Sequence, residues 1–182
     1  RVPFDDDRSN FKMISELIVD QSDIPRGQVH PIEAMEPDAD ARYERALRET
    51  LEWREKGHDR LDYVLLGMGS DAHTASLFPK SPALDATEKL VTINEGPTVT
   101  PPDRVTMTYE LLNASRFVSV MVTGAGKRPT LARVAAAGRK GDRRELPILG
   151  VKPLAGEMRW YLDAEACPTP EADAGPGSAG GA

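Results

Sequence analysis

The chain has 182 residues, of which 40% are apolar and 29% charged, a composition typical of one folded domain rather than of a disordered segment. Its net charge of −6 argues against a general nucleic-acid binder or a protein of anionic membrane surfaces, although an acidic protein can still hold a locally basic site. The single cysteine, Cys167, excludes an internal disulfide framework and predicts a cytoplasmic protein, and no apolar run approaches the ~20 residues of a membrane-spanning helix.

The first part of the chain is predicted to be helical. Residues 7–10 have the composition of a turn with a helix cap, and apolar residues at helical spacing follow them. Residues 24–32 contain two prolines and a glycine, which predicts a connector. Asp38 is expected to cap a longer helix that runs to about residue 56 and is ended by Gly57.

From residue 61 onward, strands are expected to alternate with helices. Leu61–Leu66 is an apolar run without alternation, which predicts a strand buried on both faces. The other expected elements are strands over 89–94, 104–108, 117–123 and 159–163 and helices over 109–114 and through Leu131, Val134 and Ala137. This order predicts a mostly parallel, Rossmann-like three-layer α/β/α sheet in one domain over 1–163. Residues 164–182, rich in Pro, Gly and Ala, are expected to be a disordered tail.

The loop after the first of these strands is the best candidate for chemistry. Asp71 and His73 follow the glycines Gly67 and Gly69 and precede an expected helix start. In open α/β sheets, ligands bind at the carboxyl ends of the strands, and imidazole suits acid–base work near neutral pH. The alternative is a capping loop in which both side chains only satisfy backbone groups. Because no second His or Cys stands at ligand spacing, no metal site is expected.

Two further positions could contact an anion. Gly124-Ala-Gly-Lys127 follows the strongest predicted strand and opens a helix, so its amides and its lysine could bind a phosphate. The alternative is an ordinary turn with a solvated lysine. Arg104 begins another predicted strand and is either a surface charge or a residue that organises a site by holding a carboxylate.

Together these motifs resemble the family that comprises 6-phosphogluconolactonases and glucosamine-6-phosphate deaminases. The strongest match is Asp62-Tyr-Val-Leu-Leu-Gly-Met-Gly-Ser-Asp-Ala-His-Thr-Ala-Ser-Leu-Phe-Pro79. Its Thr-Ala-Ser-Leu-Phe-Pro ending is lactonase-like, whereas the deaminases carry an ending of the Ile-Ala-Phe-Asn-Glu-Pro type. Residues 101–108 resemble the lactonase pattern Pro-Pro-x-Arg-Ile-Thr-Leu-Thr. Further matches are Ser9-Asn10, residues 24–30, Thr123–Lys127 and Trp160–Asp163.

The resemblance implies hydrolysis of 6-phosphoglucono-δ-lactone to 6-phosphogluconate in the oxidative pentose phosphate pathway. It implies His73 as the general base, with Asp71 supporting the imidazole, and Lys127 as a phosphate ligand. The residues implied to bind substrate, including loop amides that stabilise an oxyanion, are Ser9, Asn10, Gly69, Ala72, Arg104 and Lys127. It implies no cofactor, a small sugar-phosphate lactone as the partner, no nucleic-acid or membrane partner, and a monomer or homodimer.

The sequence departs from the family pattern in two ways. The family usually has Asp-Gly-His where this chain has Asp71-Ala72-His73, which carries a cost if the glycine is needed for a positive φ or for close approach of the backbone to the substrate. The family's Gly-Gly-Ser/Thr loop and Asp-Glu-Arg motif precede the position of Arg1, so the chain is expected to be a carboxy-terminal portion that lacks N-terminal strands. The alternatives are a related sugar-phosphate isomerase or deaminase and a non-catalytic phosphosugar-binding remnant.

Overall fold

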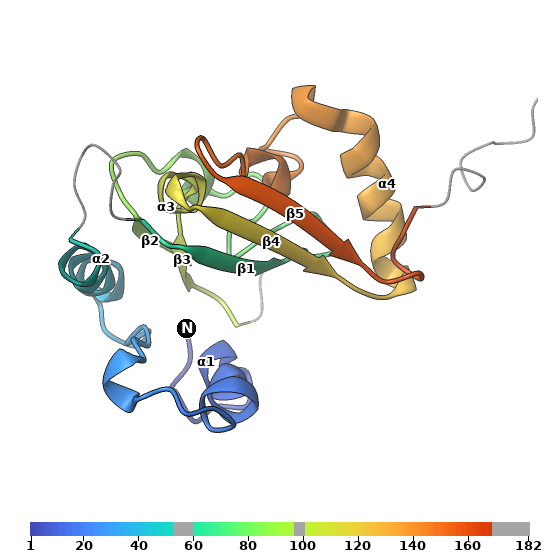
Figure 1. The fold of residues 1–182 in the computed structure, drawn as a ribbon. Coiled ribbons are helices and arrows are strands. Elements are labelled where there is room, and N and C mark those ends of the chain that lie inside the picture. Colours follow the sequence, from blue (N-terminus) through green and yellow to red (C-terminus); the bar gives the residue numbers. More distant parts are fainter. Residues whose placement is uncertain (53–59, 97–100, 169–182) are drawn as a thin grey trace, which may run out of the picture.

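A parallel three-stranded sheet forms the centre of the computed structural model, which describes residues 1–52, 60–96 and 101–168 (Figure 1). The strands are β1 (Tyr63–Gly67), β4 (Phe117–Val122) and β5 (Glu157–Leu162), in the order β1-β4-β5. Because all three run in one direction, their carboxyl ends meet at one edge of the sheet. The structure therefore confirms the predicted α/β class with a parallel sheet.

Helix α4 packs against one face of this sheet, and the N-terminal helices lie beyond the β1 edge (Figure 1). The α-helices are α1 (Asn10–Ile14), α2 (Ala39–Thr50), α3 (Tyr109–Ala114) and α4 (Arg128–Ala137). A π-helical turn covers Ser15–Val19, and 3₁₀ turns cover Arg26–Gln28, Pro82–Asp85, Ala125–Lys127, Gly138–Lys140 and Pro147–Gly150. None of the helices in the described ranges combines the length and apolar character needed to cross a membrane.

The predicted helix caps have different outcomes. Ser9 caps α1, because its Oγ accepts a hydrogen bond from the Lys12 amide at 3.2 Å. Asp38 is the N-cap residue of α2, as predicted, but its side chain makes no capping hydrogen bond. The helix ends at Thr50, and the expected stop at Gly57 lies outside the described residues.

Two predicted strands form a separate hairpin. Strands β2 (Val91–Asn94) and β3 (Arg104–Met107) pair with each other in antiparallel register, with Asn94 opposite Arg104. They do not join the parallel sheet, so the expectation of one continuous sheet is wrong for this part of the chain. The hairpin packs against α2 through a buried cluster of Leu47, Leu90, Val91 and Leu111.

The core lies on one face of the parallel sheet. Val64, Leu66, Val118 and Val120 share it with residues of α4, Leu131 and Val134 among them. Burial along β1 alternates, and the side chains of Tyr63 and Leu65 on the other face are 57% and 53% exposed. The prediction that this strand is buried on both faces is therefore wrong. The described N-terminal helices do not cover the second face, where Tyr63 stacks on Phe117 at 5.7 Å.

Glu44 joins α2 to the hairpin. Its Oε2 accepts hydrogen bonds from the Leu90 amide at 2.9 Å and from the Val91 amide at 3.4 Å, while its Oε1 pairs with Arg48 at 2.7 Å. A carboxylate that accepts amides at the start of a strand replaces the water those amides lose on folding.

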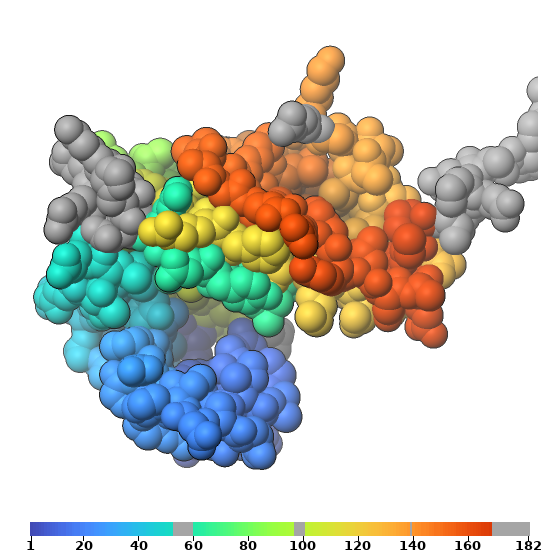
Figure 2. Space-filling view, viewed as in Figure 1, coloured from blue at the N-terminus to red at the C-terminus, as the bar shows by residue number. Residues whose placement is uncertain are grey.

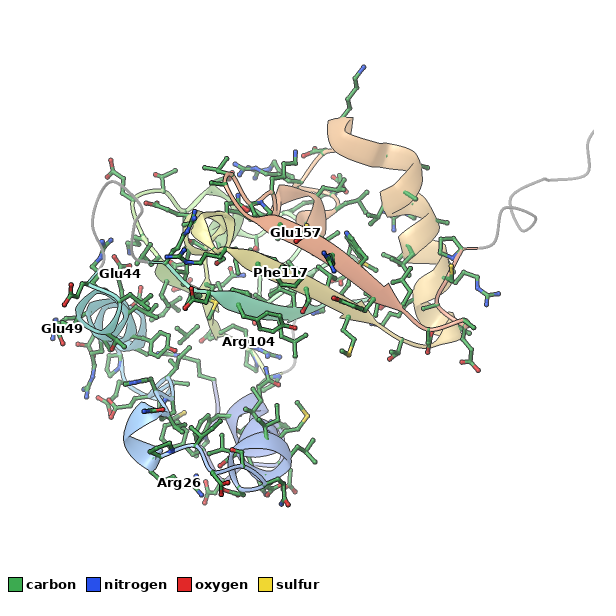
Figure 3. The ribbon with its side chains drawn as sticks, viewed as in Figure 1. Arg26, Glu44, Glu49, Arg104, Phe117 and Glu157 are labelled. Atoms are coloured by element: carbon green, nitrogen blue, oxygen red, sulfur yellow. The ribbon has the colours of Figure 1, made fainter. Side chains whose placement is uncertain are left out.

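We expect Glu44→Ala to lower the free energy of unfolding by about 1–3 kcal/mol, because it leaves the Leu90 amide unpaired beside a buried side chain. Urea denaturation measures the change. Glu49→Ala is the matched control on the same helix, since its exposed side chain accepts no bond from the hairpin, and it should change stability by less than about 0.5 kcal/mol (Figure 3). Equal losses in the two variants would contradict the assigned role of Glu44.

Candidate active site

The loop over residues 68–79 begins where β1 ends, at the carboxyl edge of the sheet. Thr74 Oγ1 donates a hydrogen bond to the Gly67 carbonyl at 2.8 Å, and the Gly69 amide donates to the His73 carbonyl at 2.8 Å. The Leu77 amide donates to the Thr74 carbonyl at 2.9 Å, which closes a second turn. These bonds give the loop one defined conformation and fix the position of the side chains it carries.

Asp71 and His73 form a hydrogen-bonded pair on this loop. The distance between His73 Nδ1 and Asp71 Oδ1 is 2.6 Å, and the His73 amide donates to the same oxygen at 3.1 Å. The His73 ring also packs against Phe78, with ring centroids 4.8 Å apart. When the carboxylate accepts at Nδ1, the proton sits on Nδ1 and Nε2 keeps a lone pair that can take a proton.

The ionisation of Asp71 supports this tautomer. Partial burial by itself raises the pKa of the Asp71 carboxyl, but the hydrogen bonds from the His73 amide and ring outweigh it and bring the pKa below its ordinary value. Asp71 is therefore a carboxylate at neutral pH and acts as an acceptor only. The side chains of Asp71 and His73 remain 49% and 34% exposed, so a small molecule can reach them.

Gly69 provides the space for the pair. A Cβ placed on Gly69 would lie 2.1 Å from His73 Nδ1 and 2.5 Å from Asp71 Oδ1, far inside van der Waals contact. The side chains of Asp71 and His73 therefore pack directly against the backbone of Gly69. The Gly69 and Ala72 amides, which the resemblance implied as oxyanion donors, both donate within the chain, to the His73 carbonyl and to the Gly69 carbonyl respectively.

Ala72 is strained but well packed. Its φ is +67°, in the left-handed region that favours glycine, so the unfavourable case raised by the sequence holds. The residue is fully buried within the main core, and its carbonyl accepts a hydrogen bond from the Ile148 amide at 3.0 Å. The left-handed backbone costs about 1–2 kcal/mol, and burial of the methyl group offsets about 0.8 kcal/mol of it.

The Gly124–Lys127 turn follows β4, next to the loop over 68–79 at the same sheet edge. Gly124 has a φ of +89°, and its amide donates to Asp163 Oδ2 at 2.9 Å, so that amide is already occupied by an anion. Lys127 lies at the start of α4, and among the described residues its ammonium makes no ion pair. One turn further along α4, Thr130 Oγ1 donates to the Ser70 carbonyl. That bond ties the helix that follows Lys127 to the loop that carries His73.

A cavity of about 550 Å³ lies between the N-terminal residues and the β2–β3 hairpin, visible as a hollow in Figure 2. Ser9, Asn10, Arg104 and Ser76 line it together, so the structure brings together three residues that only the resemblance had connected. Arg104 lies between the sheet and the N-terminal helices, and its Nε donates to the Pro101 carbonyl at 3.0 Å (Figure 3). Burial lowers the pKa of the Arg104 guanidinium.

The candidate residues therefore fall into two groups joined by one loop. His73, Asp71 and Lys127 do not line the cavity, whereas Ser76, three residues after His73, does. Sequence reasoning missed Ser76 and Thr130. Ser76 lies inside the Thr-Ala-Ser motif, but Thr130 carries no sequence signal beyond its place one helical turn after Lys127.

The remaining candidates are possible metal ligands and the other two histidines. Among residues 1–52, 60–96 and 101–168, no group of three or more His, Cys, Asp or Glu side chains is arranged to hold a metal ion. His30, in the connector over residues 24–32, is exposed, and His58 lies outside the described residues.

The chain matches a family model described as glucosamine-6-phosphate isomerases/6-phosphogluconolactonase over residues 1–160. It is 38% identical to the 6-phosphogluconolactonase of Synechocystis over 169 residues, which cover 91% of this chain and 68% of that protein. It is 34% identical to a probable chloroplastic 6-phosphogluconolactonase of Oryza sativa, covering 91% of this chain and 53% of the relative. The chain thus spans about half to two thirds of the length of these relatives.

The fold is also similar to those of solved structures. The crystal structure of a devB protein superposes with a TM-score of 0.78 at 29% identity, covering 91% of this chain and 68% of that one. The 6-phosphogluconolactonase of Thermotoga maritima superposes with a TM-score of 0.70 at 32% identity, covering 88% and 67%. A monomeric glucosamine-6-phosphate deaminase shares the fold, with a TM-score of 0.63 at 17% identity.

We expect Ala72→Gly to change the free energy of unfolding by less than about 1 kcal/mol, because relief of the left-handed strain is offset by the lost methyl and the looser unfolded chain. Ala72→Val should cost more than about 2 kcal/mol, because a β-branched side chain is strained at this φ and overfills the core. Denaturant unfolding tests both variants. Ala41→Gly, at an exposed position of α2, is the control and should cost about 1 kcal/mol. A loss from Ala72→Gly larger than from the control would contradict this balance.

The lowered pKa of Asp71 also predicts a pH dependence of stability. A carboxyl whose pKa is lowered on folding stabilises the protein above its unfolded pKa of about 4, and the contribution disappears as the pH falls through the lowered folded value. Asp71→Asn should therefore be less stable than the parent at pH 6 and approach it in acid. Urea midpoints between pH 2.5 and 7 measure this, with the exposed Asp5→Asn as control. Parallel profiles for parent and Asp71→Asn would refute the prediction.

Proposed function

We propose that this chain, which belongs to the family of glucosamine-6-phosphate isomerases and 6-phosphogluconolactonases, carries the acid–base centre of a 6-phosphogluconolactonase. The observation that carries the proposal is the Asp71–His73 pair at the carboxyl edge of the parallel sheet. Its support is the lactonase-like ending of the same loop and the similarity of the chain to 6-phosphogluconolactonases at 34–38% identity. Because the chain spans only about half to two thirds of those relatives, activity and substrate are proposed for the protein that contains it.

The proposed reaction needs one residue for two proton transfers. His73 Nε2 takes a proton from a water molecule as the water oxygen bonds to the lactone carbonyl carbon. The tetrahedral intermediate then expels the ring oxygen, and the imidazolium returns its proton to that oxygen, which gives 6-phosphogluconate. Asp71 accepts the hydrogen bond from Nδ1–H of His73 in both steps and stabilises the transient positive charge on the ring.

The negative charges of the oxyanion and the phosphate need hydrogen-bond donors that are not already used within the chain. Since the Gly69 and Ala72 amides donate within the loop, the Ser70 amide is the candidate donor to the developing oxyanion, because it donates to no other described residue. Lys127 is proposed to bind the phosphate, and Ser9, Asn10 and Arg104 to contact the sugar through the cavity they line.

The substrate, partners, compartment and oligomeric state of the protein are also proposed. The substrate is a small phosphorylated lactone, no cofactor enters the chemistry, and the net charge of −6 supports the absence of a nucleic-acid or anionic membrane partner. The single cysteine supports a reducing compartment such as the cytoplasm, although the rice relative is named as chloroplastic. A monomer or homodimer is proposed, as implied by the family resemblance.

A non-catalytic phosphosugar-binding module is the second candidate. The observation in its favour is that the cavity is lined by Arg104 and Ser76 but not by His73. A sugar-phosphate isomerase or deaminase is disfavoured by the Ser76-Leu77-Phe78 ending, and ammonia release from glucosamine 6-phosphate would restore it.

We expect His73→Ala to lower the rate of lactone hydrolysis by at least about 100-fold, because general acid–base catalysis contributes that much or more. The measurement is acid release in a pH-stat, corrected for spontaneous ring opening. Binding of 6-phosphogluconate, followed by calorimetry, should persist in the variant. An unchanged rate in His73→Ala would falsify the catalytic assignment, and binding without hydrolysis by the parent protein would favour the binding module.

A further inference from the structure

We propose that Ser76 is a further substrate-contacting residue, whose hydroxyl binds an oxygen of the phosphosugar while Asn94 and Thr106 hold it in place. The inference rests on the proposed function for the identity of the ligand. Its geometry concerns a different part of the loop from the Asp71–His73 pair. It also gives the β2–β3 hairpin, which lies outside the parallel sheet, a direct part in the site.

Side chains of the hairpin hold Ser76 on both sides. The Ser76 amide donates to Thr106 Oγ1 at 3.0 Å, and the Ser76 carbonyl accepts from Asn94 Nδ2 at 2.7 Å. Only 8% of Ser76, 1% of Asn94 and 2% of Thr106 is exposed, so both hydrogen bonds are shielded from water. Shielded bonds of this kind restrict the backbone of residue 76 far more than solvent-exposed ones would.

This arrangement is energetically unfavourable in two places. Asn94 Oδ1 is buried and has no hydrogen-bond partner among the described residues, although the amide nitrogen of the same side chain donates to both Ser76 and Ser81. Ala75, directly before Ser76, has a φ of +49°, which is unfavourable for a residue with a Cβ. An unpaired buried acceptor and a left-handed backbone beside one residue indicate that its position is under a functional constraint.

The Ser76 hydroxyl is available for a ligand. Ser76 lines the cavity of about 550 Å³, and its Oγ makes no hydrogen bond to any described residue. It is also absent from the described buried polar atoms that lack a partner, so it is open to the cavity rather than sealed in the core. The hydroxyl can therefore exchange a hydrogen bond with water for one with a bound molecule.

The neighbouring groups define the chemistry of that molecule. Arg104 lies opposite Asn94 in the hairpin, so the strands that hold Ser76 also place a guanidinium in the same cavity. A guanidinium only donates hydrogen bonds, whereas a serine hydroxyl both donates and accepts. This combination fits an oxygen-rich anionic ligand with hydroxyl groups, which is the chemistry of a sugar phosphate.

The test compares two serines that share one partner. Ser76 and Ser81 both interact with the Asn94 amide, but Ser81 does not line the cavity. In the complete protein, we expect Ser76→Ala to weaken 6-phosphogluconate binding, measured by calorimetry, at least about fivefold, the effect of one lost hydrogen bond. We expect the KM for the lactone to rise by a similar factor with an unchanged pH profile. Ser81→Ala should stay within about twofold of the parent in both measurements.

A second pair of variants separates positioning from folding. Thr106→Val removes the acceptor of the Ser76 amide while keeping the side-chain shape, and it should weaken binding, whereas Thr106→Ser should restore it. Parent-like binding by Ser76→Ala, equal losses in Ser76→Ala and Ser81→Ala, or a parent protein that binds no 6-phosphogluconate would each overturn the inference. Binding that depends on Ser76 without hydrolysis would instead contradict only the proposed function, while hydrolysis with a parent-like KM in Ser76→Ala would contradict only the role of Ser76.

Discussion

The close approach of Asp71 and His73 above the backbone of Gly69 is the constraint on which the rest of the site depends. The 2.6 Å bond between Nδ1 and Oδ1 assigns the ring proton to Nδ1 and leaves Nε2 for chemistry. This geometry exists only because residue 69 has no Cβ, since a methyl group there would overlap both side chains. The close packing of the Asp71–His73 pair therefore depends on the absence of a side chain at residue 69.

The loop that carries this pair is held by three separate parts of the fold. Thr130 of α4 donates to the Ser70 carbonyl, the Ile148 amide donates to the Ala72 carbonyl, and the hairpin binds both backbone groups of Ser76. Each bond joins residues at least 18 positions apart in the chain. Such anchoring holds the Asp71 and His73 side chains in place, which would lower the entropic part of the barrier in the proposed reaction. It also explains how the strained backbone at Ala72 persists, because the surroundings determine its conformation.

Local patterns predicted most elements but not the way in which they associate. The apolar run at Leu61–Leu66 does form a strand, yet its burial alternates, because α4 covers one face and the described N-terminal helices do not cover the other. Residues 91–94 and 104–107 form strands where expected, but they pair with each other. Apolar periodicity reports that a segment is extended, and it is the same for a parallel and an antiparallel partner. The choice of partner depends on contacts between distant residues.

The sequence by itself determined the chemistry of the site. It placed a carboxylate, an imidazole and a glycine on one loop after a strand, and a lysine on the turn after another strand. Residue types and the succession of strands along the chain can both be read from the sequence. Only the tertiary structure decided that the φ of Ala72 is positive, that the Gly69 and Ala72 amides are already used, and that Ser9, Arg104 and Ser76 share one cavity. These features arise from packing between segments far apart in the chain, and no local pattern encodes them.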